Sequence, residues 1–357
     1  MPRAVARKTE GVDRGAVGLE SLDSEVQGIG DADAPVRRRG DVGREIELPG
    51  AHTARIHECA EDPLGDVKGL GLQQRTSFQD LLDERDFVPG ETTDLCVTHR
   101  TQVPPEVESE IDAAPLAVLR DSDIYVDQLY RGAPKNGATL LVSRVSRYVV
   151  DLNRGPEDVD SAAVPRHPRG RHIPARGVVW RARTDGTPLL RAPLSIEQFS
   201  RRLELFYNPY HQALRDVAAQ ILREHGRVLI LAAHSMPSSG RRTIGGGKVR
   251  RADVVPGTRG RSTADGRIID LIDSHFREAG LSVKHDDPYR GGWTTSSYGA
   301  PKRGQHAVQI ELNRALYVDE HTSEIKKEDF AQLQAVLEQL VHKLGKLLRG
   351  SSQFATG

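Results

Sequence analysis

The sequence lacks several features that mark common classes of protein. Its two cysteines, Cys59 and Cys96, cannot make a disulfide framework and do not form a metal-type pair. No apolar run approaches the roughly 18–20 residues that span a bilayer, and the charged N-terminus carries no apolar segment typical of a secretory signal. A Gly-x-Ser-x-Gly motif is also missing, so a serine nucleophile has little support. We expect a protein of a reducing, cytoplasmic compartment.

The chain also has no excess of charge of either sign. Lys and Arg number 50, as do Asp and Glu, so no overall field attracts nucleic acid or an anionic membrane. Neither nucleic acid nor a membrane is therefore an expected partner, and the oligomeric state stays open. The 357 residues suffice for one large α/β domain or two ordinary domains.

The first 100 residues or so differ in composition from the rest. Up to about Asp94 the chain is rich in Gly, Arg and Asp, has no Tyr or Trp, and shows neither a helical nor a strand period. Such a segment buries too little apolar surface to offset the entropy of ordering it. We therefore expect a poorly ordered extension over residues 1–100 and a folded domain over residues 101–350.

Beyond Pro104 the sequence alternates between strand and helix patterns. This alternation predicts an α/β fold, with a mostly parallel or mixed central sheet and helices on both faces. Strands are expected at Ala138–Val142, Tyr148–Leu152, Arg227–His234, Leu281–Lys284 and Ala307–Leu312, and helices at Asp121–Tyr130, Ile196–Glu224 with a break near Asn208-Pro209, Arg267–Ala279 and Glu328–Leu348.

Three of the expected strands end in polar side chains, where open parallel sheets bind ligands. His234 follows six apolar residues and either ligates a divalent metal or caps the loop. Glu311 is either a general base or the partner of an arginine such as Arg314. Asn153-Arg154 either holds a carboxylate or forms a turn with a solvated arginine.

Two carboxylates at the expected helix Asp121–Tyr130 have a similar ambiguity. Asp121 and Asp123 either cap backbone N–H groups or turn one oxygen into the site as a metal ligand. Spacing alone does not choose between these roles.

Between about Val103 and Glu320 the chain resembles the N-formylglutamate amidohydrolases, whose fold is similar to that of the zinc carboxypeptidases, a phosphorylase/hydrolase-like architecture. Seven blocks match in the family's order: Asp121–Tyr130, Ser146–Arg154, Tyr207–His211, His234–Pro237, Asp253–Gly260, Asp287–Thr294 and His306–Arg314.

The resemblance implies roles for individual residues. His234 looks like a zinc ligand, Glu311 like the catalytic glutamate, and Asp123, rather than Asp121, like the acidic ligand. The implied substrate-binding residues are Arg147, Asn153, Arg154, Arg259, Tyr289, Arg290, Gly292 and Thr294. His211 and His306 are either supporting residues or ordinary buried histidines.

The first metal-ligand motif departs from the family pattern, which is an apolar strand followed by Pro-His-Ser/Ala-Gly. His99 stands at the expected place, but Thr98 replaces the Pro, the Gly is missing, and the expected strand is reduced to Leu95–Val97. These departures lead to the hypothesis that residues 1 to about 100 are read in a shifted frame. Translation of the upstream DNA in the other two frames tests it.

The resemblance implies a Zn²⁺-dependent amidohydrolase that converts N-formyl-L-glutamate, or a related N-acyl amino acid, to formate and L-glutamate, as in histidine catabolism. Zinc-activated water would attack, with Glu311 as general base. The alternative is a catalytically impaired protein that binds an amino acid or carboxylate and lacks a complete metal site.

Overall fold

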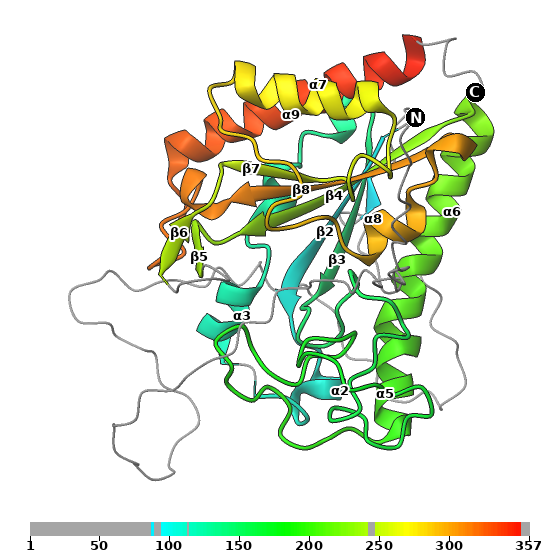
Figure 1. Cartoon of the computed structure of the whole chain (residues 1–357), viewed down its shortest axis with the longest axis vertical. Coiled ribbons are helices and arrows are strands. Elements are labelled where there is room, and N and C mark those ends of the chain that lie inside the picture. The colour runs from blue at the N-terminus through cyan, green and yellow to red at the C-terminus, as the bar shows by residue number, and fades with distance from the viewer. Residues whose placement is uncertain (1–86, 89–93, 113, 242–246, 351–357) are drawn as a thin grey trace, which may run out of the picture.

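A six-stranded sheet forms the centre of the protein (Figure 1). The computed structural model describes residues 87–88, 94–112, 114–241 and 247–350. In spatial order the strands are β1 (Phe87–Val88), β3 (Thr139–Val145), β2 (Asp94–Gln102), β4 (Val228–Met236), β8 (Gln305–Asn313) and β7 (Val254–Gly257). The four inner strands are parallel, whereas β1 and β7 pair antiparallel at the two edges. The expected mixed sheet is confirmed.

Helices cover both faces of this sheet. The long helices α7 (Gly266–Glu278) and α9 (Lys327–Gly350) lie side by side on one face, and α6 (Asn208–His225) lies on the other (Figure 1). The short elements are α2 (Pro105–Glu108), α3 (Pro115–Asp121), α4 (Val126–Leu129), α5 (Ile196–Arg202), α8 (Trp293–Tyr298), the 3₁₀ turns Pro134–Asn136, Pro301–Arg303 and Arg314–Leu316, and the hairpin of β5 (Ser239–Arg241) and β6 (Lys248–Arg250).

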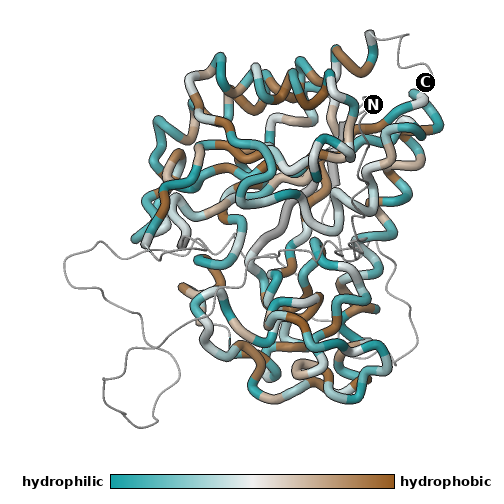
Figure 2. Tube along the Cα trace, in the orientation of Figure 1, coloured by the Kyte–Doolittle hydropathy of each residue, from teal (hydrophilic) through white to brown (hydrophobic). Residues whose placement is uncertain are grey.

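Side chains alternate between two separate cores along the inner strands. In β4 the even-numbered residues from Val228 to Ala232 belong to the core that includes α6, and the odd-numbered residues from Leu229 to Ala233 belong to the core of α7 and α9. A strand buried on both faces reads as a continuous apolar run, as predicted for this segment. Figure 2 shows hydrophobic and hydrophilic residues alternating along α7 and α9, as expected for helices with one buried face.

Most of the predicted elements beyond Pro104 are confirmed, including the break in the long helix. A π-helix, Leu203–Tyr207, joins α5 to α6 at this break. The predicted strand Leu281–Lys284 is wrong, because only Val283 makes a bridge, to Val254. None of the helices in the described ranges is long and apolar enough to cross a membrane.

The predicted helix Asp121–Tyr130 is also wrong. Helix α3 ends at Asp121 and α4 begins at Val126. Between them Tyr125 has a φ of 61°, a left-handed conformation that cannot lie inside a right-handed helix. The resulting irregular segment brings Asp123 to the carboxyl end of the inner strand β4.

Residues 146–195 contain no long helix or strand and form a lobe below the sheet (Figure 1). The predicted strand Tyr148–Leu152 is wrong, because this segment folds in turns. The N–H of Val149 bonds the carbonyl of Ser146, and that of Asp151 bonds the carbonyl of Val178. The lobe is anchored by the buried Arg202, whose guanidinium donates to the Val149 carbonyl.

The strand before His99 is longer than the sequence predicts. We expected only Leu95–Val97, but β2 spans nine residues, Asp94–Gln102, and pairs with both β3 and β4. Its two parallel neighbours supply backbone hydrogen bonds that a local apolar pattern does not reveal. The predictions for residues 1–86 lie outside the described residues, and the shifted-frame hypothesis stays a prediction.

Candidate active site

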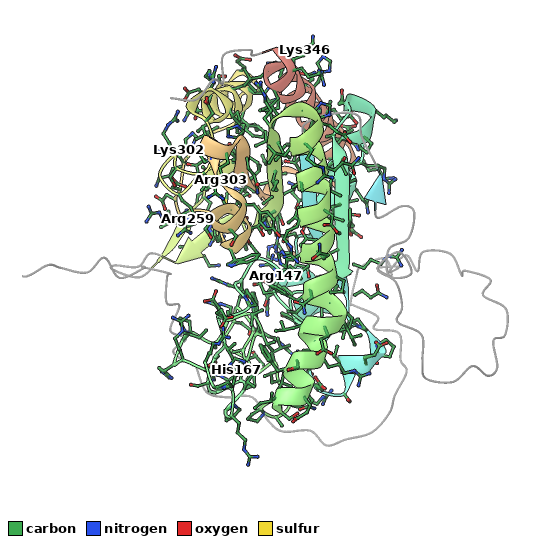
Figure 3. The ribbon with its side chains drawn as sticks, turned by 90° about the vertical axis from the view of Figure 1, so that its right-hand side faces the viewer. Arg147, His167, Arg259, Lys302, Arg303 and Lys346 are labelled. Atoms are coloured by element: carbon green, nitrogen blue, oxygen red, sulfur yellow. The ribbon has the colours of Figure 1, made fainter. Side chains whose placement is uncertain are left out.

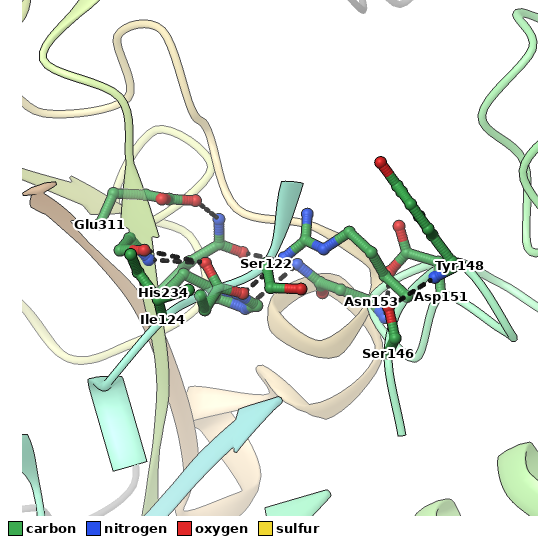
Figure 4. Close-up of polar contacts among 12 residues, drawn as sticks. Ser122, Ile124, Ser146, Tyr148, Asp151, Asn153, His234 and Glu311 are labelled. Atoms are coloured by element: carbon green, nitrogen blue, oxygen red, sulfur yellow. Dashed lines mark hydrogen bonds and ion pairs between the residues drawn. The ribbon is translucent and has the colours of Figure 1, made fainter. Parts of the chain in front are cut away.

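His234 and Glu311 lie side by side where the parallel strands β4 and β8 end. The two residues are register partners. Because their neighbours alternate between the two cores, both side chains fall on the sheet face that meets α6 and the lobe. Both are almost fully buried, with exposed fractions of 4% and 5%. The structure therefore brings together the two residues that the sequence singled out at strand ends (Figure 4).

Asp123 contacts His234 from the segment between α3 and α4. Its Oδ2 atom lies 3.0 Å from Nδ1 of His234, and its Oδ1 atom accepts a hydrogen bond from the Ser235 backbone N–H at 2.8 Å. Burial alone would lower the pKa of His234, but the Asp123 carboxylate outweighs it, and the pKa lies above its usual value. Asp123 and His234 thus form a buried pair beside Glu311.

The two aspartates of this segment have different surroundings. The Asp121 carboxylate accepts hydrogen bonds from the Tyr148 hydroxyl at 2.8 Å and the Thr184 backbone N–H at 3.0 Å. It anchors the lobe, and none of its hydrogen bonds goes to His234. The prediction of Asp121 as a second candidate ligand stays a prediction; of the two aspartates, Asp123 is the one whose carboxylate contacts His234.

The Glu311 carboxylate is held by a neighbour on its own strand. Its Oε1 atom accepts a hydrogen bond from Nε2 of Gln309 at 2.8 Å. Burial raises the pKa of Glu311, and the cationic neighbours His234 and Arg147 oppose the shift. The sequence left open an ion pair between Glu311 and Arg314. Arg314 instead donates to the Ser122 carbonyl at 2.6 Å and to the Ser235 hydroxyl at 3.1 Å.

Asn153 lies in a turn of the lobe and not at a strand end. The Asp151 carboxylate stabilises this turn by accepting hydrogen bonds from the Asn153 backbone N–H and from Trp180 Nε1, both at 2.9 Å. The Asn153 side chain donates to Gln309 Oε1 at 3.0 Å and accepts from the Thr294 backbone N–H at 3.1 Å. Its amide nitrogen also lies 3.4 Å from Nε2 of His234.

Gly292 completes this arrangement, because a side chain there would collide with Asn153. A Cβ atom at Gly292 would lie 2.5 Å from Cγ of Asn153. The Gly292 backbone N–H donates to Gln309 Oε1 at 2.9 Å. Asn153, Gly292 and Thr294, which the sequence analysis assigned to substrate binding, are thus brought together.

Arg147 lies at the junction of the sheet and the lobe (Figure 3). Its Nη2 atom is 2.5 Å from Oδ2 of Asp123, and its guanidinium lies 5.6 Å from the centre of the Trp180 ring. Arg154 is less tightly held, with Nε 3.9 Å from Oδ2 of Asp151. The sequence did not single out Arg176, a half-buried residue whose guanidinium lies 5.9 Å from the centre of the same Trp180 ring.

Arg176 carries its charge in an environment that disfavours it. Burial lowers its pKa, and the like charge of Arg154 lowers it further. Within the described residues its side chain makes no hydrogen bond or ion pair. Arg147, Arg154 and Arg176 therefore place three guanidinium groups around Asp151 and Trp180, next to Asn153.

The remaining predicted residues lie farther from this centre. Tyr289 is close enough for the Glu311 charge to raise its pKa, after the larger effect of burial, and it packs against Arg251 with 5.2 Å between guanidinium and ring centre. Arg259 is exposed, and its guanidinium donates to the Gly291 carbonyl at 2.9 Å. Arg290 is exposed, and its carbonyl accepts from the Arg259 backbone N–H at 2.9 Å. In the described part, no contact joins Arg259 or Arg290 to Asp123, His234 or Glu311.

Supporting residues hold the Asn153 turn from behind. His211 is buried, with Nε2 3.0 Å from the Leu152 carbonyl and Nδ1 3.2 Å from the Tyr298 hydroxyl. Tyr207, at the end of the π-helix, donates to the Arg154 carbonyl at 2.8 Å. His306 stands at an even-numbered position of β8, whereas Glu311 stands at an odd-numbered one, so their side chains lie on opposite faces of the sheet. His306 therefore faces the core of α7 and α9, away from Glu311.

The donor set fits a divalent metal in part. Asp123 and His234 supply a carboxylate oxygen and an imidazole nitrogen, which are the ligand types that Zn²⁺ accepts. The backbone of His99 lies in β2, two residues beyond Val97, the last residue of this strand that pairs with β4. The His99 side chain lies outside the described residues. Among the described side chains, no group of three His, Cys, Asp or Glu residues could hold a metal.

Gln309 and Arg176 are the two site residues that the sequence analysis missed. Gln309 stands two positions before Glu311 on the same strand, and this spacing alone predicts a shared face. Arg176 lies in an irregular segment, where no helical or strand period in the sequence indicates the direction of its side chain.

Comparisons with known proteins identify relatives of this chain. A chain from Pseudomonas aeruginosa named N-formylglutamate deformylase is 30% identical over 230 residues, covering 63% of this chain and 82% of the relative. A protein of the same name from Pseudomonas putida is 31% identical, with the same coverage of this chain and of the relative.

Solved structures show the same fold. The N-formylglutamate amidohydrolase from Ralstonia eutropha has a TM-score of 0.67 and 28% identity, covering 74% of this chain and 99% of that one. A gene product from Agrobacterium tumefaciens shares the fold alone, with a TM-score of 0.50 and 19% identity over 71% and 91% of the two chains. The family model described as N-formylglutamate amidohydrolase matches residues 96–318. The chain, a hydrolase, therefore belongs to the N-formylglutamate amidohydrolase family.

Proposed function

We propose that this protein hydrolyses N-formyl-L-glutamate, or a related N-acyl amino acid, to formate and L-glutamate, a reaction of histidine breakdown. The family match supports the substrate class. The observation that carries the proposal is the placement of the Asp123–His234 pair and the Glu311 carboxylate on one face of the sheet, beside three guanidinium groups.

Glu311 is the proposed general base. Its buried carboxylate has a raised pKa, which suits a group that takes a proton and later returns it. It removes a proton from the attacking water as the water oxygen bonds to the formyl carbon. The proton passes to the leaving nitrogen as the carbon–nitrogen bond breaks, and formate and the free amino acid result.

Asn153 and the arginine cluster are proposed to orient the substrate. N-formyl-L-glutamate carries two carboxylates, and guanidinium groups bind carboxylates through paired N–H donors. Arg154 and Arg176 lie close enough to oppose each other's charge, and a bound carboxylate would relieve this repulsion. Such binding fixes the formyl group relative to Glu311.

Asp123 and His234 are the proposed ligands of a Zn²⁺ ion, with His99 on the adjacent strand as a third. When bound, the metal would supply a Lewis acid for the formyl group and for water. The chain's own residues hold and orient the substrate and move the proton.

Formate release from the purified full-length chain tests the proposal, with metal content measured on the same sample. We expect turnover of N-formyl-L-glutamate, about one zinc per chain, and loss of both on chelation. Turnover that survives complete metal removal would contradict the metal assignment. Amino-acid-dependent thermal stabilisation without metal or turnover would instead support the carboxylate-binding alternative.

A further inference from the structure

Gln309 lies between the proposed general base and the turn that carries Asn153. Its side chain is buried, with 4% of its surface exposed. Nε2 donates to Glu311 Oε1 at 2.8 Å, while Oε1 accepts from Asn153 Nδ2 at 3.0 Å and from the Gly292 backbone N–H at 2.9 Å. One amide therefore connects three separate parts of the site.

These partners leave the Gln309 amide a single orientation. Two donors, from Asn153 and Gly292, converge on its oxygen. A flipped amide would place its NH₂ group against the Gly292 N–H and its oxygen against the Glu311 carboxylate. Both contacts would be repulsive in a buried setting. The orientation that presents an N–H to Glu311 is thus imposed by the chain.

The hydrogen bond from Gln309 constrains the Glu311 carboxylate. With Oε1 held, rotation of the carboxylate about its last bond is restricted, and Oε2 is left for proton transfer. A hydrogen bond to a charged acceptor is stronger than one between neutral groups, so this restraint is substantial. The Asn153 turn is held at the same time through the other end of the amide.

We propose that Gln309 is a positioning residue that fixes the Glu311 carboxylate and sets its distance from the substrate-binding turn at Asn153 and Gly292. This inference rests on the proposed role of Glu311 as general base. The contacts predict two separable effects: one on kcat, through Glu311, and one on substrate affinity, through Asn153.

A double-mutant cycle tests the first effect. Gln309→Met keeps the length of the side chain and removes the amide, so we expect kcat for N-formyl-L-glutamate to fall by about 10- to 100-fold. In a Glu311→Gln background the same change should lower the residual rate by less than about twofold, because the group it positions is already gone. An equal loss in both backgrounds, or no loss of kcat in Gln309→Met, would overturn the proposal.

A binding measurement tests the second effect without turnover. Calorimetry on Glu311→Gln should show substrate affinity falling several-fold when Gln309→Met is added. Gln334→Met is the matched control, since Gln334 on α9 also donates one hydrogen bond, to the Gln128 carbonyl, outside the site. If Gln309→Met does not fold, Gln309→Leu decides, because it removes both the donor and the acceptor of the amide with a smaller apolar side chain. Unchanged kcat in that variant would refute the role.

The two proposals fail in different ways. If the wild-type enzyme does not hydrolyse N-formyl-L-glutamate but hydrolyses another N-acyl amino acid, the proposed substrate is wrong. The double-mutant cycle is then measured with that other compound as the substrate. If Glu311→Gln keeps full activity, the proposed base is wrong and the inference about Gln309 falls with it. If Glu311→Gln is inactive but the cycle shows no coupling, only the inference about Gln309 is overturned.

Discussion

Oδ2 of Asp123 lies 3.0 Å from Nδ1 of His234, although 111 residues separate the two in the chain. The same Asp123 oxygen accepts a hydrogen bond from Arg147 at 2.5 Å. One carboxylate oxygen therefore contacts both an imidazole and a guanidinium in a buried setting. A cation bound between Asp123 and His234 would compete with Arg147 for the Asp123 carboxylate.

Replacement of Asp123 by Asn tests this arrangement. Asp123→Asn removes the negative charge and leaves Arg147 without its nearest partner, and the loss of one member of a largely buried pair costs about 3 kcal/mol. We expect a lower free energy of unfolding in urea, loss of bound zinc measured by mass spectrometry, and loss of turnover. Asp329→Asn, at an exposed position of α9, is the control. Full zinc content in Asp123→Asn would argue against Asp123 as a ligand.

Replacement of Glu311 by Gln separates chemistry from binding. General base catalysis contributes typically 10²–10⁴-fold, so we expect Glu311→Gln to lower kcat by roughly 10³-fold. Zinc content and substrate affinity should change little, because the amide is nearly isosteric with the carboxylate. Glu328→Gln, in the exposed first turn of α9, should behave as wild type. Unchanged turnover would remove Glu311 from the base role.

Arg176 provides a test of substrate recognition. Its guanidinium lies over Trp180 next to Arg154, so a substrate carboxylate would be a favourable partner. We expect Arg176→Gln to raise KM for N-formyl-L-glutamate by about tenfold, the equivalent of one charge-assisted hydrogen bond. KM for N-formyl-L-leucine, which has one carboxylate, should change much less if Arg176 binds the second carboxylate. Arg169→Gln, at an exposed position, is the control, and equal effects on both substrates would contradict the assignment.

The contact between Gly292 and Asn153 predicts a steric effect. The Gly292 backbone is extended, with a φ of −84°, so alanine is not strained there, but its Cβ would lie 2.5 Å from Cγ of Asn153. We expect Gly292→Ala to displace Asn153 and lower kcat/KM by at least about tenfold. In Gly266→Ala the new Cβ meets only Nη2 of Arg261, at 3.4 Å, and activity should persist. Wild-type kinetics in Gly292→Ala would show that Asn153 is not needed in its present place.

His306 gives a prediction about stability against pH. Burial lowers its pKa to about 4, whereas an unfolded histidine titrates near 6.5. The unfolded chain therefore binds this proton first as the pH falls. The stabilising contribution of the neutral ring is fully present above pH 6.5 and is lost as the pH falls toward 4.

Between pH 7 and pH 5, protonation linked to His306 should lower the free energy of unfolding by about 2 kcal/mol. Urea unfolding at the two pH values should therefore show a smaller decline in His306→Gln than in the wild type. His342→Gln, at an exposed position of α9, should decline as the wild type does. An equal decline in His306→Gln and wild type would exclude this histidine as the source.

The sequence by itself determined the elements whose residues follow a regular period. The apolar run before His234 and the alternation around Glu311 specify buried strands, because side chains alternate between the two faces whatever the rest of the chain does. The helical period of residues 328–348 likewise specifies an amphipathic helix. The resemblance of the seven blocks was also visible in the sequence and led to the correct family.

Only the tertiary structure decided which polar groups meet. Asp121 and Asp123 are two residues apart and chemically identical. The backbone turns at Tyr125, which has a left-handed conformation, and Arg314 donates a hydrogen bond to the Ser122 carbonyl. As a result Asp123 contacts His234, whereas Asp121 contacts Tyr148. Likewise Asn153 lies in a turn because hydrogen bonds from distant segments outweigh the local preference for a strand. A local pattern carries propensity and period, whereas the partner of a buried polar group depends on contacts between segments far apart in the chain.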